Sequence, residues 1–199
     1  MSIITLPTTG MMFGAGCGMG LRNFDMLSGS DLTGTMQART FAPARWVLKL
    51  VSPSKLDHIE AGPWERTILQ LRGRSNHLAA FDPGRPVPRG TRRGSLSLGA
   101  AGAIGDPSIS VTGAGTLLTG DLLQIGTGLG TSQLVKVMGD TSGASVQIEP
   151  PLRMTFSAGS IVTWDHPVAY FKQTGESSIW TYETALQSGY ALDLLESWE

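Results

Sequence analysis

Six short apolar runs between residues 95 and 164 decide the fold class of this chain. They read SLSLG (95–99), SISVTG (108–113), LLTGDLLQIG (117–126), SQLVKVMG (132–139), ASVQIEPPL (144–152) and SIVTW (160–164). Each has the length of a strand, and glycine turns separate them at fairly regular intervals, which is typical of a small barrel or sandwich. GDLLQIG and QLVKV predict a strand pair. SVQIEP predicts a strand that ends where Pro150 and Pro151 forbid ladder hydrogen bonds.

The chain before and after this region also contains strand patterns. TGTMQARTF (33–41) and ARWVLKLV (44–51) alternate between two faces, and Ala42-Pro43 splits them, which predicts a β-hairpin. In the second run Trp46, Leu48 and Leu50 share one face. AYFKQTG (169–175) and residues 178–199 predict two or three further strands. By contrast, MMFGAGCGMG (11–20) mixes glycine with large apolar residues, so we expect it to order only against a neighbour.

A short helix is predicted at residues 63–72. Pro63 suits the first helical position, and Trp64, Ile68 and Leu71 then fall on one face until Gly73 ends the run. Gly62-Pro63 argues against a continuous helix that would include the preceding turn. Residues 77–94, HLAAFDPGRPVPRGTRRG, predict a short strand followed by a rigid, extended connector and a domain boundary.

Composition limits the class of protein. The 199 residues fit one domain, or one domain with an insertion, and 26 glycines with 11 prolines imply many turns between short elements. Cys17 is the only cysteine, so an intramolecular disulfide is impossible and a reducing compartment such as a bacterial cytosol is expected. The N-terminus lacks a signal pattern, and no run approaches the ~18 apolar residues of a membrane span, so we expect a soluble protein without a membrane partner.

No catalytic, metal-binding or nucleotide-binding pattern stands out. His58, His77 and His166 are dispersed, and the Asp-His neighbours at 57–58 and 165–166 point apart on a helix or strand. The glycine clusters at 14–18 and 126–130 do not continue into Gly-Lys-Ser/Thr. We therefore expect no enzyme, no metal and no cofactor. Scattered carboxylates leave a hydrolase open as an alternative, although turn chemistry accounts for them: Asp106, Asp121, Asp140 and Glu149.

Charge is distributed unevenly along the chain. Seven arginines lie between residues 66 and 93 with one acid, Asp82, whereas only acids follow Lys172. Opposite poles favour contact between copies, although neutralisation within one copy is the alternative. The candidate inter-subunit or lumen contacts are Arg72, Arg74, Arg85, Arg89, Arg92, Arg93, Glu196 and Glu199. An acidic partner surface is favoured over DNA phosphate. The tryptophans are predicted core or interface anchors: Trp46, Trp64, Trp164, Trp180 and Trp198.

In their order, these segments resemble the distal tail proteins of long-tailed bacteriophages and gene transfer agents. The segments concerned are TGTMQARTFAPARWVLKL (33–50), a helix ending in LQLRGR (69–74), HLAAFDPGRPVPRG (77–90), a β-rich region with GDLLQIG (120–126) and SVQIEPPLR (145–153), and GYALDLLESWE (189–199). The resemblance spans nearly the whole chain and depends on the order of elements, since no single motif in it is diagnostic.

The resemblance implies a mainly β protein with two parts. Residues 1–94 and 165–199 would form a discontinuous, tail-tube-like β-sandwich or barrel domain with one short helix, and residues 95–164 an inserted outer β-barrel or β-sandwich. It implies a structural virion protein, assembled in the host cytoplasm and located in the viral tail. That protein would form a ring, expected to be hexameric, which joins the tail tube to the baseplate hub.

The same resemblance also implies which partners the protein has. They would be other copies of the chain, the tail tube protein and the baseplate hub or other tail-tip proteins, with DNA passing only transiently through the lumen during ejection. Two alternatives stay open: a tail tube or tail terminator protein, and a glycan-binding host-adhesion module in which Trp164 and Trp180 would stack on sugars.

Overall fold

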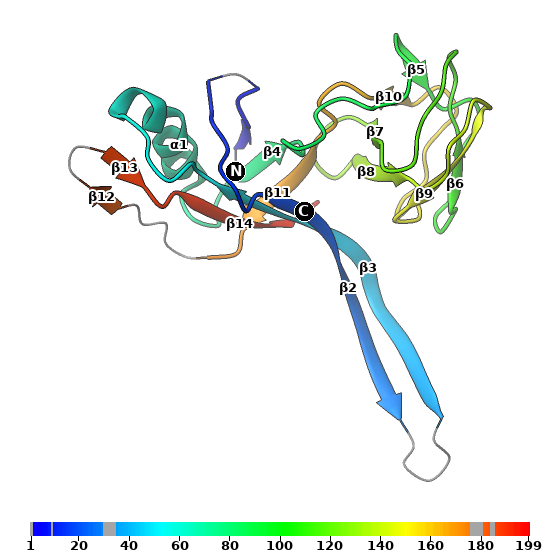
Figure 1. Cartoon of the computed structure of the whole chain (residues 1–199). Helices are drawn as coiled ribbons and strands as arrows, with labels where there is room; N and C mark the ends of the chain where they lie inside the picture. The colour runs from blue at the N-terminus through cyan, green and yellow to red at the C-terminus, as the bar shows by residue number, and fades with distance from the viewer. Residues whose placement is uncertain (1, 9, 30–34, 176–180, 184–185) are drawn as a thin grey trace.

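A computed structural model of the chain describes residues 2–8, 10–29, 35–175, 181–183 and 186–199. As predicted, these residues are mainly β, with one helix among them (Figure 1). The elements are β1 (Ile3–Thr5), β2 (Gly18–Gly29), β3 (Met36–Val51), α1 (His58–Leu71), β4 (His77–Ala80), β5 (Leu96–Ser97), β6 (Ser108–Ser110), β7 (Leu122–Gly126), β8 (Ser132–Val137), β9 (Ser145–Glu149), β10 (Ile161–Thr163), β11 (Ala169–Gln173), β12 (Thr181–Glu183), β13 (Leu186–Ser188) and β14 (Ala191–Glu196).

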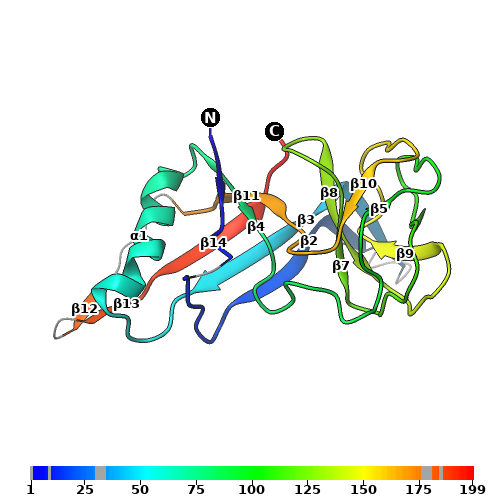
Figure 2. The same cartoon turned by 90° about the horizontal axis from the view of Figure 1, so that it is seen from above.

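Two six-stranded sheets organise the chain. The first has the order β1-β4-β11-β14-β3-β2 and is antiparallel except for the β1–β4 pair. The second has the order β5-β10-β7-β8-β9-β6, and all its strands lie between residues 95 and 164. We name these residues the insert. Figure 2 shows α1 at one end of the molecule and the insert at the other. The strand pair predicted from GDLLQIG and QLVKV is confirmed as β7 and β8.

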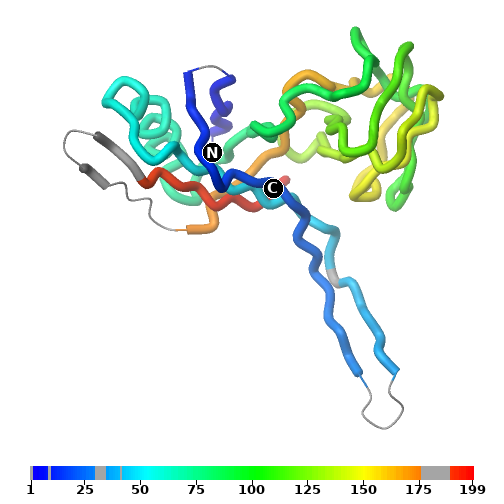
Figure 3. The backbone as a smooth tube through the Cα atoms, in the orientation of Figure 1, coloured from blue at the N-terminus to red at the C-terminus, as the bar shows by residue number. Residues whose placement is uncertain are grey.

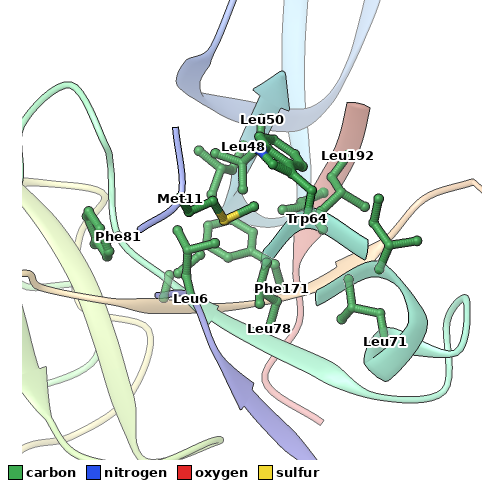
Figure 4. Close-up of a cluster of buried hydrophobic side chains, with 14 of the residues drawn as sticks. Leu6, Met11, Leu48, Leu50, Trp64, Leu71, Leu78, Phe81, Phe171 and Leu192 are labelled. Carbon is green, nitrogen blue, oxygen red and sulfur yellow. The ribbon is translucent and has the colours of Figure 1, made fainter. Parts of the chain in front are cut away.

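Helix α1 covers one face of the first sheet. Trp64 and Leu71 point from the helix toward Leu48, Leu50 and the other apolar side chains of the sheet, as Figure 4 shows. The alternation predicted for β3 is confirmed, since Trp46, Leu48 and Leu50 are all buried. Burying a side chain of this size is worth roughly 1.5–3 kcal/mol, so this layer carries much of the stability of the first sheet.

Helix α1 begins earlier than the sequence predicts. The expected break at Gly62-Pro63 is wrong, because a capping box starts the helix at His58: the carboxylate of Asp57 accepts from the backbone N–H groups of Ile59 and Glu60, both at 2.8 Å, and Glu60 caps Asp57 in return. This start outweighs the hydrogen bond that Pro63 cannot donate. The predicted end is close, since Leu71 is the last helical residue and Arg72 adopts a left-handed conformation.

The hairpin predicted within residues 33–51 is also wrong. Met36–Val51 is one strand, and it pairs with β2 rather than folding back on itself. The register between β2 and β3 shifts on either side of Phe24. Pro43 lies in this irregular stretch, where β3 residues are left out of the ladder, so the strand continues through it.

Residues 11–17 order against their own chain, contrary to expectation. Met11 is buried, the backbone N–H of Gly14 donates to Val51 O at 2.7 Å, and the ring of Phe13 meets Trp64 edge-on with centroids 6.0 Å apart. A Cβ at Gly14 would lie 2.2 Å from Ser52 O. The glycine therefore permits a close approach of two backbones, which is a structural reason for its presence in this apolar segment.

Candidate assembly surfaces

The outer halves of β2 and β3 form a two-stranded arm. We define the arm as residues 24–29 and 35–40; Figure 3 shows the two strands leaving the rest of the molecule together. Every described residue of the arm except Phe24 is exposed, on both faces of the ribbon. Three of its exposed side chains are large and apolar: Met26 is 58% exposed, Leu27 63% and Met36 73%.

The register places these apolar side chains mainly on one face of the arm. Leu27 stands opposite Ala38, and Gly29 stands opposite Met36, so these positions share a face with Asp25 and Thr40. The sequence does not reveal this surface, because alternation along a strand predicts one buried face and here neither face of the arm is covered. The available signal was the adjacent pair Met26-Leu27, which puts apolar residues on both faces of a strand.

A groove opens between the base of the arm and the insert. Its volume is about 490 Å³, and its lining is mostly apolar. The arm side contributes Asn23, Asp25, Thr40, Ala42, Pro43 and Ala44, and the insert side contributes Ile104, Gly105, Glu149, Pro150, Pro151, Leu152 and Arg153. Ile104 is 68% exposed and stands at the mouth of this arm–insert groove. Asp25 and Glu149 are its exposed acids.

A second groove lies at the other end of the molecule, between the edge strand β1 and helix α1. It measures about 680 Å³ and is polar. Its lining contains two arginines and no carboxylate: Ser2, Ile3, Ile4, Thr5, Pro7, Arg66, Thr67, Gln70, Arg72 and Asn76. The outer face of α1 beside it carries Ile59, which is 72% exposed, and Leu69, which is 64% exposed. We name Ile59, Arg66 and Leu69 the helix stripe.

A buried ion pair joins the insert to the first sheet. Arg153 donates to the carboxylate of Glu196 at 2.6 Å, and the second carboxylate oxygen accepts from the backbone N–H of Trp46 at 3.0 Å. The indole N–H of Trp46 in turn donates to Leu134 O in the insert at 2.8 Å. Glu196 is only 2% exposed, so its predicted role in contact between copies is wrong. Its charge is used within the chain.

Trp198 packs against this contact between the insert and the first sheet. Two guanidinium groups lie over its ring: Cζ of Arg45 is 4.4 Å and Cζ of Arg153 is 4.2 Å from the ring centroid. Such cation–π contacts are worth about 0.5–2 kcal/mol each. A further tie comes from Val168, whose backbone N–H donates to the side-chain oxygen of Gln124 at 3.1 Å.

Three of the predicted contact arginines, Arg85, Arg89 and Arg92, donate hydrogen bonds from the connector to the insert. Arg92 is only 1% exposed, and its guanidinium donates to backbone carbonyls, among them Gly143 O at 2.8 Å. Its predicted role toward a neighbour or the lumen is therefore wrong. Arg85 donates to Gly120 O and Arg89 to Thr119 O, while Arg93 donates to Pro88 O.

The remaining predicted charges lie at the surface. Arg72 and Arg74 follow α1 and are exposed, and Arg74 donates to Thr174 O. Glu199 is exposed at the end of the chain. The role of these three residues toward a neighbour stays a prediction.

The tryptophans divide into two groups. Trp46 and Trp64 are core residues, as predicted, and Trp64 also donates its indole N–H to Met12 O at 2.9 Å. Trp164 is half-buried: its indole N–H donates to Gly94 O at 2.8 Å, and Arg93 covers its ring at 4.8 Å. This occupied ring does not favour sugar stacking. Trp180 lies outside the described residues.

Asp121 and Asp140 of the insert serve turns, as expected, whereas Glu149 is the last residue of β9. Asp121 is buried and accepts from the backbone N–H groups of Arg89, Gly90 and Leu118 at 2.8–3.1 Å. Asp140 accepts from the backbone N–H and the hydroxyl of Thr119, and these hydrogen bonds lower the pKa of Asp140. Within the described part of the chain, no three His, Cys, Asp or Glu residues gather as a metal site would require.

Among the described residues, α1 is the one helix, and it is not long and apolar enough to cross a membrane. Comparison with protein-family models and with curated proteins finds no match to this chain.

Proposed function

We propose that the protein is a structural subunit of a homo-oligomeric ring at the distal end of a phage tail. The observation that carries this proposal is the arm. An isolated two-stranded ribbon is marginal in water, yet this one extends beyond the sheet with both faces exposed and three large apolar side chains on it. Such a ribbon is stabilised when another surface covers it.

Further copies of the same chain are the simplest source of that surface. The order of sequence segments resembles that of distal tail proteins, in which copies form one ring between the tail tube and the baseplate hub. The arm is part of the first sheet, whose strands all come from residues 1–94 and 165–199. A contact through the arm would therefore couple the sheets of neighbouring copies directly.

Electron microscopy of the purified protein tests the proposal. We expect two-dimensional class averages with sixfold rings at high protein concentration, with a central opening wide enough for duplex DNA. A protein that stays monomeric at every concentration, and is missing from purified virions of its phage, would overturn it.

Copy number per virion separates the distal ring from the related alternatives. A distal ring contributes one ring of copies, whereas a tail tube protein contributes many stacked rings. Quantitative mass spectrometry of purified particles, scaled to the portal protein, measures this ratio. A ratio of one ring supports the distal position, and a ratio of many rings replaces it with the tube.

A further inference from the structure

We infer that the helix stripe of one copy docks in the arm–insert groove of the next copy. This inference builds on the proposed ring and identifies the two surfaces that meet in it. The groove is apolar and flanked by exposed side chains, and the stripe presents Ile59 and Leu69 to solvent. Each surface exposes apolar side chains to water, and the other surface could cover them.

Charge complementarity favours this pairing. The groove carries two exposed acids, Asp25 and Glu149. Glu149 pairs across β8–β9 with Lys136, a cation. Asp25 pairs across β2–β3 with Thr40, so no cation stands directly opposite it. The stripe carries Arg66 beside Leu69, and the adjoining groove adds Arg72 and no carboxylate. A contact that sets Arg66 against Asp25 and Leu69 against Ile104 matches both charge and apolar character.

The position of the two surfaces excludes contact within one copy. Helix α1 lies at one end of the molecule and the insert at the other, in both views (Figures 1 and 2). The buried Arg153–Glu196 pair and the Trp46 hydrogen bond tie the insert to the first sheet. A head-to-tail contact between two different surfaces generates a closed ring when its rotation closes. The arm of each copy would then reach beside the helix of its neighbour.

Engineered cysteines test the contact directly. In a Cys17→Ala background, Leu69→Cys protein is mixed with Ile104→Cys protein under mild oxidation, and we expect a disulfide-linked dimer on a non-reducing gel. The matched control is Leu69→Cys mixed with Ile161→Cys, because Ile161 is also an exposed apolar residue of the insert, at 57%, but lies on β10, outside the groove. Equal cross-linking of both pairs would overturn the docking inference.

Charge reversal supplies an independent test. Asp25→Lys and Arg66→Asp should each raise the concentration at which rings form by at least about tenfold, because like charges then face each other. Combining both changes should restore most of the assembly, whereas either change combined with Glu199→Lys should not. The readout is the mass distribution by analytical ultracentrifugation.

The outcomes separate the inference from the proposed function. If the unmodified protein forms rings while neither the charge reversals nor the Leu69–Ile104 pair responds, the docking surfaces are wrong and the ring subunit stands. If the unmodified protein never assembles, both are wrong. Assembly that depends on the two reversals and on their combination supports both.

Discussion

Single charged residues have opposite uses in this chain, depending on where the tertiary structure places them. Glu196 is the same residue type as the exposed Glu199, and Arg92 the same as the exposed Arg72. Yet Glu196 is only 2% exposed and Arg92 only 1%. Arg92 is surrounded by backbone carbonyls, and Glu196 is paired with Arg153. Charge at these positions maintains internal structure, so only the charges that remain at the surface are available for contact with another molecule.

Replacing Glu196 by Gln tests the buried ion pair. The change leaves the guanidinium of Arg153 buried without its counter-charge, and we expect the free energy of unfolding to fall by about 3 kcal/mol. Chemical denaturation followed by circular dichroism measures this loss. Glu199→Gln is the matched control, an exposed acid in the same tail, and should change stability by less than about 0.5 kcal/mol. Equal effects of the two substitutions would contradict the role of the pair.

His77 predicts a pH dependence of stability. It is buried, and burial, followed by the charge of Lys172, lowers the pKa of its imidazole from the usual 6.5. The unfolded chain therefore binds a proton at a higher pH than the folded chain does. The contribution of His77 is complete above pH 6.5 and is lost as the pH falls through the lowered folded pKa.

The measurement compares the unfolding free energy between pH 7.5 and pH 5.5 in the natural protein and in His77→Met. The natural protein should lose more stability than the variant over this interval, because only the natural protein takes up this proton on unfolding. Identical slopes in both proteins would show that His77 is not the group concerned.

At the scale of elements, the inner and outer halves of β2 and β3 have different roles. Their inner halves belong to the first sheet, where Leu48 and Leu50 are buried, and their outer halves form the exposed arm. The register shift on either side of Phe24 separates the two. Exposed residues in the outer halves can therefore be replaced without lowering the stability of the first sheet.

Replacing Met26, Leu27 and Met36 by Ser tests this division of roles. Because the three side chains are exposed, the unfolding free energy of the isolated subunit should change by less than about 0.5 kcal/mol per substitution, whereas ring formation should be lost or strongly weakened. Denaturation at low concentration and sedimentation at high concentration measure the two quantities. The control is Ile161→Ser, which replaces an exposed apolar residue on β10 of the insert and should leave assembly intact. Unchanged assembly of the triple variant would remove the arm from the interface.

At the scale of the whole molecule, the insert and the first sheet act as one unit. Leu122 and Leu134 of the insert belong to the same buried cluster as Trp46 of the first sheet, and the Arg153–Glu196 pair and the Gln124–Val168 hydrogen bond cross the same joint. The direction in which the insert extends is therefore set by buried contacts and not by the connector alone.

Cooperative unfolding is the expected consequence. Tryptophan fluorescence and far-ultraviolet circular dichroism should report one coincident transition in denaturant. In Glu196→Gln combined with Trp46→Phe, which removes the ion pair and the indole hydrogen bond to Leu134, the two probes should separate. Two transitions already present in the natural protein would contradict a single unit.

The sequence alone determined the mainly β class, the β7–β8 pair, the apolar face of β3 and the helical face formed by Trp64, Ile68 and Leu71. These features depend on the period of apolar residues within one segment, which a sequence displays directly. Tertiary structure decided the rest. Whether residues 36–51 fold back or continue depends on β2 as a partner. Whether Arg92 or Glu196 meets solvent depends on residues between 19 and 150 positions away in the sequence. The arm is a feature of the tertiary structure alone: both faces of the outer halves of β2 and β3 lack a cover, and alternation along a strand does not reveal whether anything packs against it.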